Sequence, residues 1–459
     1  MRKQGLFDVN MLEGSISKNI LLFALPLMAT NILQFIYSAA DMIVLGKFAG
    51  THALAAVGAT GSTYHIIINV FIGLATGVAV VVAQQIGADD RKGLSDTIHT
   101  AGLLSVIVGV FVCILGLFLS PIILKAVGTP ADIFDDAVLY LRVMFAGIPA
   151  LVVYNFGASI LRSVGDSRRP FYYLALSGAL NVILNLFFVL GFDMSVDGVA
   201  LATIISQYAS AVLVWVHLMR TGECYYFHIK EARIVKKQLF DIIRIGVPTG
   251  LQSALFSLSN LLIQSAINSF GTNYIAASTT ANNIENICYS TMAAMGQTVL
   301  VFCGQNVGAG NIKRLKNIYW ESLAVTLGVG AIISGVCILF DRSFLGLFTN
   351  DAAVVEVGLK RLSVIVPFYF ICGVYECASG ACRGTGYALS PMIGALFGIC
   401  IFRVIWLYTA FSWVPTFETL VSVYPVSWAI TFIILSVMFA VFYHLLKKRH
   451  AQNAEQIQN

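Results

Sequence analysis

The chain has 459 residues, of which 58% are hydrophobic and only 11% are charged, and its formal net charge is +5. Soluble domains carry about 25% charged residues, so this composition excludes an ordinary soluble protein and does not favour a nucleic-acid partner. A mean hydropathy of +0.83 is typical of a protein surface in contact with lipid. The nine Cys residues show no metal-ligand spacing, so we expect neither a disulfide framework nor a cysteine metal site.

Apolar runs that are long enough to cross a bilayer recur along the whole chain. A helix needs about 20 apolar residues to span the hydrocarbon core, and charged or turn residues separate such runs. The polar N-terminus up to Lys18 shows no cleavage pattern, so we expect it to be retained in the cytoplasm. Twelve spans are predicted, at residues 19–45, 53–84, 95–119, 135–158, 171–191, 197–219, 241–268, 274–304, 317–340, 354–380, 387–411 and 420–446.

The distribution of basic residues supports this even number of spans. Lys and Arg collect on the cytoplasmic side of membrane proteins. With the N-terminus inside, 21 of the 28 Lys and Arg residues fall in inside segments. The sequence therefore predicts a multi-pass protein of the bacterial cytoplasmic membrane, with both termini in the cytoplasm.

The two halves of the chain are copies of each other, at an offset of 221 residues. Each copy has an even number of spans, so both enter the membrane in the same sense as parallel repeats. We expect a first six-helix lobe at residues 1–220, a cytoplasmic linker at 221–240 and a second lobe at 241–459. Two such bundles can rock about a central site. The matched blocks are Gly50-Thr51 with Gly271-Thr272, residues 83–88 with 304–309, and Arg162, Gly165 and Pro170 with Arg383, Gly386 and Pro391.

Proline and glycine residues recur at matched places in both halves. Proline removes a backbone hydrogen bond and bends a helix, although it is also tolerated in membrane helices for packing alone. Gly87 and Gly308 follow the second span of each half, where they could serve as C-terminal caps. We expect tight inside turns where the Arg-x-x-Gly-x-x-x-x-Pro blocks recur. The prolines inside apolar runs are Pro26, Pro149, Pro248 and Pro367.

Three features together resemble the multidrug and toxic compound extrusion (MATE) transporters, in particular their bacterial DinF-like branch. They are the first-span run from Pro26 through Asp41 to Gly46, the paired Gln-Gln-Ile-Gly-Ala and Gln-Asn-Val-Gly-Ala blocks, and the paired Arg turns. The resemblance covers nearly the whole chain. It implies an all-α integral membrane protein, with twelve transmembrane helices in a V-shaped pair of pseudo-symmetric six-helix lobes. It also implies export of organic cations and other amphipathic drugs in exchange for protons or sodium ions.

Asp41 is the first of three carboxylates that stand out within the predicted spans. A charged side chain in hydrocarbon costs roughly 2.5–3.5 kcal/mol on insertion scales, so such a residue is a functional candidate. Because Gly46 and Lys47 follow closely, Asp41 could instead be a helix-end residue that reaches the outer headgroups. The functional interpretation is a carboxylate inside the first lobe that holds a proton or a sodium ion.

The resemblance supports the functional interpretation of Asp41. In the family the matching Asp is the coupling residue, and polar residues of the fifth and sixth helices join it; the positions here are Asn181, Asn185 and Thr203. Tyr37 precedes Asp41 by one helical turn. A second acid that often stands near the Asn185 position is absent, so proton coupling is at least as well supported as sodium coupling. Beyond a possible sodium ion at Asp41, no metal or cofactor is expected.

The second half carries its own intramembrane charges. The residues opposite Asp41 are Leu262 and Ile263, so that acid was not duplicated, which favours a task confined to one lobe. Glu285 and Glu376, opposite Tyr64 and Asn155, are likewise unshared, and substrate binding, second-lobe coupling or pairing with Arg361 or Arg403 are all open. The possible substrate or charge site of the second lobe comprises Glu285, Glu376, Asn260 and Gln264.

The sequence lacks the motifs of several rival functions. It has no G-x-x-x-x-G-K-[ST] loop and no H-E-x-x-H motif, so we expect an ion gradient rather than ATP to supply the energy, and we expect no enzyme activity. The alternative is a lipid-linked saccharide flippase of the same superfamily, against which the twelve spans and the absence of a basic intramembrane cluster argue. The expected partners are small organic molecules and the lipid bilayer, and the expected state is a monomer.

Overall fold

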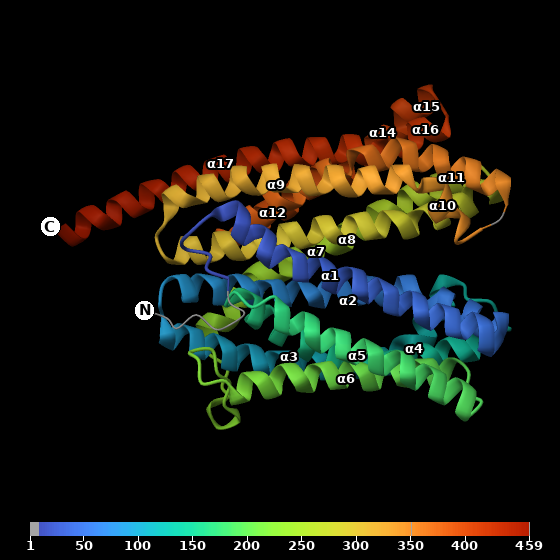
Figure 1. Cartoon of the computed structure of the whole chain (residues 1–459), viewed down its shortest axis with the longest axis horizontal. Coiled ribbons are helices and arrows are strands. Elements are labelled where there is room, and N and C mark those ends of the chain that lie inside the picture. The colour runs from blue at the N-terminus through green and yellow to red at the C-terminus, as the bar shows by residue number, and fades with distance from the viewer. Residues whose placement is uncertain (1–8, 350, 459) are drawn as a thin grey trace. The chain divides into compact units, whose positions relative to one another are not determined.

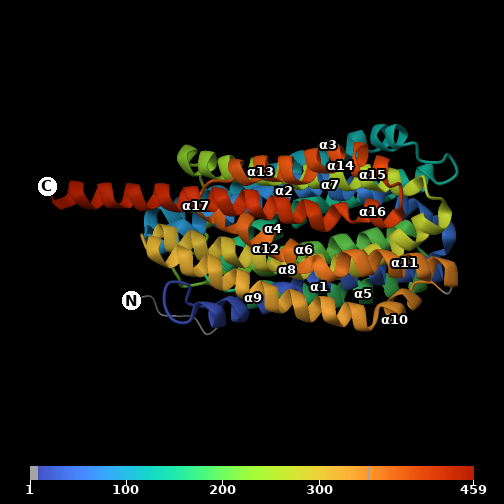
Figure 2. The ribbon, with the colours of Figure 1, turned by 90° about the horizontal axis from the view of Figure 1, so that it is seen from above.

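The computed structural model describes residues 9–349 and 351–458, without the side chains of residues 49–55, 59, 62, 63, 65–67, 70 and 453–458. Arg2 and Lys3, two of the basic residues assigned to the inside, lie outside this description. Every regular element in the described part is a helix, which confirms the all-α fold (Figure 1). Most of these helices are long, as the second view also shows (Figure 2).

The helices coincide with the twelve predicted apolar runs. Ten described helical stretches are long and apolar enough to cross a membrane; α2 and α7 are not among them, although each covers a predicted run. The first half comprises α1 (Ile16–Val44), α2 (Gly50–Gly87), α3 (Arg91–Val127), α4 (Phe134–Ser163), α5 (Arg168–Leu186) and α6 (Val196–Arg220). The second half comprises α7 (Lys236–Asn268), α8 (Thr272–Gly308), α9 (Ile312–Leu339), α10 (Asp341–Gly346), α11 (Ala352–Ile365), α12 (Tyr369–Gly384), α13 (Leu389–Ala395), α14 (Phe402–Tyr408), α15 (Ala410–Trp413), α16 (Phe417–Val421) and α17 (Val423–Gln458).

The four prolines inside apolar runs differ in their effect on the helix. Pro26, Pro149 and Pro248 lie within α1, α4 and α7, which continue through them. Pro367 lies in a 3₁₀ turn, Val366–Phe368, which separates α11 from α12 within the tenth predicted run. Only the last of the four therefore interrupts its helix, in line with the loss of a backbone donor at proline.

The repeated turns have the same backbone conformation in both halves. Gly165 and Gly386 have φ angles of 105° and 92°, a region that favours glycine. The predicted caps at Gly87 and Gly308 are wrong, because these glycines are the last helical residues of α2 and α8. The left-handed residue stands two positions later in each copy, and it is Asp89 in the first half and Gly310 in the second.

The described residues form two compact units, and the same span is central in each. In the first unit, α4 packs against α2, α3 and α6; in the second, α12 packs against α8, α9 and α17. Small residues allow the close approach of α8 and α12, because a Cβ atom added at Gly380 would lie 2.1 Å from the carbonyl oxygen of Gly296. The internal symmetry of the sequence thus reappears in the packing.

The boundaries of the two units fall inside α1 and α7. The first unit contains Val9 and residues 29–250, and the second contains residues 10–28 and the chain from Leu251 onward. The boundaries lie two or three residues after Pro26 and Pro248. Each unit therefore includes a helical segment from the other repeat. The lobes predicted from the repeat, residues 1–220 and 241–459, describe the two sequence copies and not these units. Their boundaries stay a prediction.

Candidate functional site

Asp41 near the end of α1 is held by neutral donors from two other helices. Asn185 of α5 donates from Nδ2 to Oδ1 of Asp41 over 2.5 Å, and the Thr203 hydroxyl of α6 lies 3.2 Å from Oδ2. Among the described residues, no Lys, Arg or His nitrogen forms an ion pair with this carboxylate. The structure thus joins three of the residues predicted from the sequence into one cluster in the first unit.

The cluster continues as a chain of side-chain hydrogen bonds. Asn185 Nδ2 lies 3.3 Å from Asn181 Oδ1, and Asn181 Nδ2 lies 3.3 Å from the Thr203 hydroxyl. The Thr203 hydroxyl has one proton and also lies 2.9 Å from the carbonyl oxygen of Val199. If Thr203 donates to Val199, its oxygen can accept a hydrogen bond from a protonated Asp41. The arrangement therefore accommodates a neutral carboxylic acid.

Asn185 adds one free acceptor to the same cluster. Its Oδ1 atom is buried and has no hydrogen-bond partner in the structure. Carboxylate, amide and hydroxyl oxygens are the ligands that hard cations prefer. Asp41, Asn185 and Thr203 could together contribute such oxygens to a bound cation, so the chemistry of the donor set also fits a sodium ion.

Tyr37 supports the position of α5, and its hydroxyl makes no hydrogen bond to Asp41 among the described residues. Its hydroxyl donates to the carbonyl oxygen of Ala175 over 3.1 Å. Its ring covers Gly178, where an added Cβ atom would lie 1.6 Å from the ring carbon Cζ. Glycine at this position allows α1 and α5 to approach closely, and this brings Asn181 and Asn185 toward Asp41.

Two π-helical segments follow the residues of this cluster, and no sequence pattern predicted them. Leu45–Ala49 follows Asp41 at the end of α1, and Phe187–Gly191 follows Asn185 at the end of α5. Leu45 and Val189 belong to one buried apolar cluster with Val199 of α6. Single π turns often accompany functional sites. Here the apolar cluster fixes the three helix ends just beyond the polar residues.

Glu285 in the second unit is neutralised by an arginine. Arg361 of α11 binds it in a bidentate manner, with Nε–Oε1 at 2.6 Å and Nη2–Oε2 at 3.0 Å. Both side chains are buried, with 1% of Arg361 and 6% of Glu285 exposed. Arg361 also donates to Asn282 Oδ1 over 2.7 Å. Such a pair fixes both charges, since separating them would leave a buried ion without a partner.

Arg403 forms a second buried cationic centre in the same unit. Its Nη1 atom donates to Asn260 Oδ1 over 2.7 Å, and its Nε atom donates to Ser427. The guanidinium carbon lies 4.6 Å from the ring centre of Tyr424, which also stacks with Arg361 at 5.4 Å. Asn260 therefore belongs to the environment of Arg403, which joins α7, α14 and α17.

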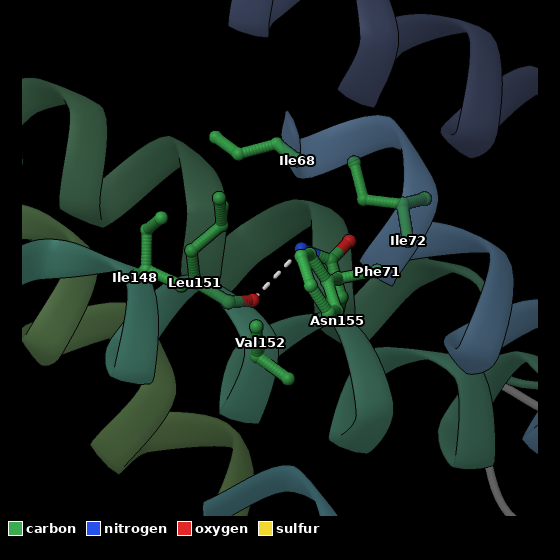
Figure 3. Close-up of a pocket in the computed structure, with 7 residues that line it drawn as sticks. All are labelled: Ile68, Phe71, Ile72, Ile148, Leu151, Val152 and Asn155. Carbon is green, nitrogen blue, oxygen red and sulfur yellow. Dashed lines mark hydrogen bonds between the residues drawn. The ribbon is translucent and has the colours of Figure 1, made fainter. Parts of the chain in front are cut away.

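Glu376 of α12 is the other carboxylate of this unit that the sequence singled out, and it forms no ion pair among the described residues. It accepts a hydrogen bond from the Tyr375 hydroxyl over 2.8 Å and is half-buried. The matched residue of the first unit, Asn155, donates to its own helix at Leu151 O over 2.8 Å. Asn155 borders an apolar pocket of about 10 Å³, which has room for about one water molecule (Figure 3). Only the second unit thus has a charge at this position.

Gln264 lies apart from both charged centres of the second unit. Its Nε2 atom donates to Asn268 Oδ1 over 3.1 Å, one turn further along α7 and at the helix surface. The four residues grouped from the sequence are therefore distributed over separate places: Glu285 with Arg361, Asn260 with Arg403, Glu376 with Tyr375, and Gln264 with Asn268.

Curated proteins similar to this chain carry names of multidrug resistance and export proteins. The probable multidrug resistance protein YoeA of Bacillus subtilis is 26% identical over 394 residues, 84% of this chain and 85% of that protein. The probable multidrug resistance protein NorM of Thermotoga maritima is 26% identical over 82% of both chains. The multidrug export protein MepA of Staphylococcus aureus strain MRSA252 is 23% identical over 87% of this chain and 88% of that protein.

Solved structures share the fold over nearly the whole chain. A multidrug resistance MATE family transporter of the MOP superfamily in an outward-facing conformation aligns with a TM-score of 0.90 and 24% identity, over 97% of this chain and 100% of that chain. A MOP superfamily transporter from Pyrococcus furiosus aligns with the same TM-score, the same coverage and 23% identity.

The family model with the description MatE matches the chain twice, at residues 26–187 and 248–409. The two matches start 222 residues apart and together cover well over half of the chain, so they reproduce the internal repeat. Assignment to the DinF-like branch stays a prediction. The chain belongs to the MatE family of membrane transporters.

Proposed function

We propose that this protein is a secondary antiporter that exports bulky amphipathic or cationic organic compounds in exchange for protons or sodium ions. The observation that carries the proposal is Asp41, an intramembrane carboxylate whose hydrogen-bond partners are the neutral residues Asn185 and Thr203. A carboxylate without a fixed counter-charge can bind and release a cation. The multidrug resistance names of the relatives support the choice of cargo.

The proposed cycle couples occupancy of Asp41 to alternating access. Binding of a proton or a sodium ion neutralises the buried charge of Asp41, and release of the ion restores that charge. The free-energy cost of burying this cluster therefore differs between the two states. Rocking of the repeats, residues 1–220 against 241–459, would open the pathway to either face in turn. We place both termini in the cytoplasm of a bacterial cell and propose that one copy of the chain is sufficient.

Glu376 is the proposed contact for a positively charged substrate in the second half. Among the described residues it forms no ion pair, whereas Glu285 is held by Arg361 and Asn260 by Arg403. A substrate cation that reaches Glu376 gains a favourable electrostatic interaction that the two other residues cannot offer. The lipid-linked saccharide alternative is not favoured, because the relatives are named for multidrug resistance or export.

The test is a transport assay with the purified full chain in liposomes. Efflux of a fluorescent organic cation is measured with either a proton gradient or a sodium gradient as the sole energy source. We expect one of the gradients to drive efflux and Asp41→Asn to abolish it. Asp193→Asn makes the same chemical change at an exposed site of the first half, and should leave efflux intact. Equal efflux with and without gradients would reject the antiport proposal.

A further inference from the structure

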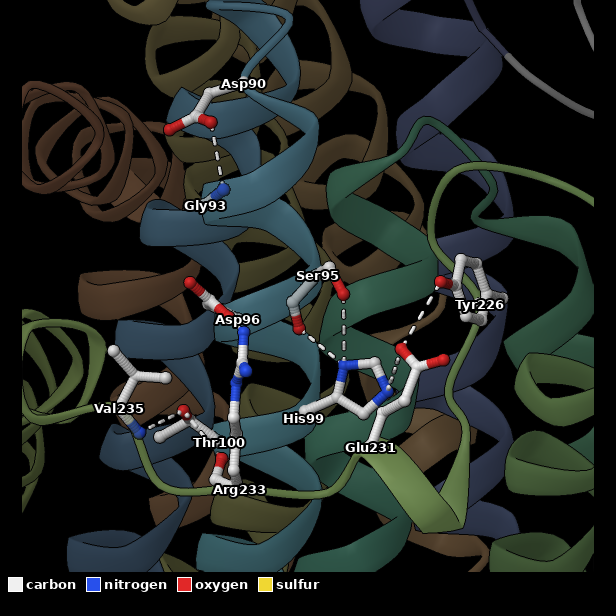
Figure 4. A network of polar contacts seen from close by, with 10 residues as sticks. All are labelled: Asp90, Gly93, Ser95, Asp96, His99, Thr100, Tyr226, Glu231, Arg233 and Val235. Carbon is white, nitrogen blue, oxygen red and sulfur yellow. Dashed lines mark hydrogen bonds and ion pairs between the residues drawn. The ribbon is translucent and has the colours of Figure 1, made fainter.

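The cytoplasmic ends of the two units differ in a way that points to a ligand. In the first unit, the start of α3 is covered by the segment 228–235 that precedes α7 (Figure 4). Arg233 pairs with Asp96 over 2.6 Å, the backbone N–H of Val235 donates to the Thr100 hydroxyl, and the backbone N–H of His228 donates to His99. A basic segment of the chain itself therefore occupies an acidic surface at this place.

The start of α9, the corresponding surface of the second unit, carries fewer acids; the one it has, Glu321 at the position of Thr100, accepts hydrogen bonds from Ser17. At the offset of 221 residues, the positions of Asp89, Asp90 and Asp96 hold neutral residues. Lys92 is matched by Lys313, Gly93 and Ser95 are matched by Arg314 and Lys316, and Arg91 is matched by the apolar Ile312. The three neutral replacements are Gly310, Asn311 and Asn317.

This surface borders a cavity of about 620 Å³ between the start of α9 and the end of α17. The cationic side chains of its lining are Lys313, Arg314 and Lys447, joined by His450, and none of its lining residues is acidic. Arg314 donates from Nη2 to Gly14 O over 2.9 Å, while its buried Nε atom has no hydrogen-bond partner in the part of the chain that the structure describes. Three positive charges around one cavity without a carboxylate favour an anionic ligand.

We propose that this cavity binds the phosphate-bearing headgroup of an anionic phospholipid from the cytoplasmic leaflet. The charge distribution places these basic residues on the cytoplasmic side of the membrane, where the leaflet contains anionic lipids. A free phosphate ion would fill only a small part of 620 Å³, whereas a headgroup also occupies the remaining volume and can bond to Asn317 and Tyr443. The location rests on the proposed orientation of the chain, but the binding is independent of its transport activity.

The test measures lipid binding to the delipidated full chain in detergent, by native mass spectrometry and by the thermal unfolding midpoint. The probes are phosphatidylglycerol, phosphatidylcholine and inorganic phosphate. We expect saturable binding of phosphatidylglycerol, at least tenfold tighter than that of phosphatidylcholine. Since each basic residue near an anionic lipid contributes about 1 kcal/mol, Lys313→Gln with Lys447→Gln should weaken phosphatidylglycerol binding about tenfold or more.

Two further variants separate this site from general surface charge. Asn311→Asp with Asn317→Asp restores two of the acids of the first unit at nearly constant size, and it should also weaken binding about tenfold, since it lowers the formal charge of the lining from +3 to +1. Lys236→Gln with Lys237→Gln removes two exposed charges that do not line the cavity and should change affinity less than twofold. Equal weakening by this control pair, no preference for phosphatidylglycerol, or binding of inorganic phosphate that displaces the lipid would each overturn the proposal.

Discussion

The Asp41 cluster and the Glu285–Arg361 pair are two ways to keep a carboxylate inside a membrane protein. Asp41 is bound by an amide and a hydroxyl, which carry no charge. Glu285 is bound by a guanidinium at two positions. Neutral donors stabilise a carboxylate without fixing its charge, while a buried ion pair strongly resists the loss of either partner. The neighbours of an intramembrane acid, and not its presence alone, therefore distinguish the proposed coupling residue from an acid held in an ion pair.

The largest expected effect is on transport, at Asp41. Asp41→Asn keeps the size of the side chain and removes its ability to take up a cation. We expect efflux in liposomes to fall to that of protein-free vesicles, with the thermal unfolding midpoint unchanged or higher because a buried charge is gone. Glu285→Gln should leave part of the efflux activity. Full activity of Asp41→Asn would erase the functional difference between the two carboxylates.

The second expected effect is on stability, at the ion pair. Arg361→Met leaves Glu285 buried without its cation, and breaking a buried pair in this way costs about 3–5 kcal/mol. The free energy of unfolding, measured by denaturant titration in mixed micelles, should fall by that amount. The double variant Arg361→Met with Glu285→Met should recover most of the loss. A double variant as unstable as the single one would show that the methionine side chain, and not the orphaned charge, is the cause.

A smaller expected effect concerns the packing that positions the first cluster. Gly178→Ala places a methyl group against the Tyr37 ring, and overpacking of this kind costs about 1–3 kcal/mol. Both the free energy of unfolding and the efflux rate should decrease, because α5 carries Asn181 and Asn185. Tyr37→Ala in the same chain makes room for the methyl group and should restore part of the stability. Gly191→Ala, at the end of the π-helical segment of α5, is the matched control, since no atom lies closer than 4.0 Å to its added Cβ.

The smallest expected effect is at Thr203. Thr203→Val removes the hydroxyl between Asp41 and Asn181 and keeps the shape of the side chain. A hydrogen bond of this kind contributes about 1 kcal/mol, so we expect efflux to slow about fivefold without being lost. Thr203→Ser retains the hydroxyl and should behave like the unmodified protein. Identical rates for the valine and serine variants would remove Thr203 from the coupling site.

Much of the fold was predictable from the sequence, because hydrocarbon requires long apolar helices and the repeat required a matched set in each half. The cluster of Asp41, Asn181, Asn185 and Thr203 was named through the family resemblance, and its geometry connects all four. The pairing of Glu285 was left open between Arg361 and Arg403, since both lie on helices far away in the chain. Chain order does not determine which helix faces meet, and the π-helical segments beside Asp41 and Asn185 arise from packing at the helix ends.

The division of α1 and α7 between the two units has a consequence for biosynthesis. Residues 10–28 are synthesised before α2 to α6, but they belong to a unit whose other members begin at Leu251. This stretch of the nascent chain must therefore wait in the membrane, without its final neighbours, until the residues from Leu251 onward have been translated. A ribosome that stalls after α6 would release a product in which residues 10–28 lack the rest of their unit. Such a product would be a target for membrane quality-control proteases.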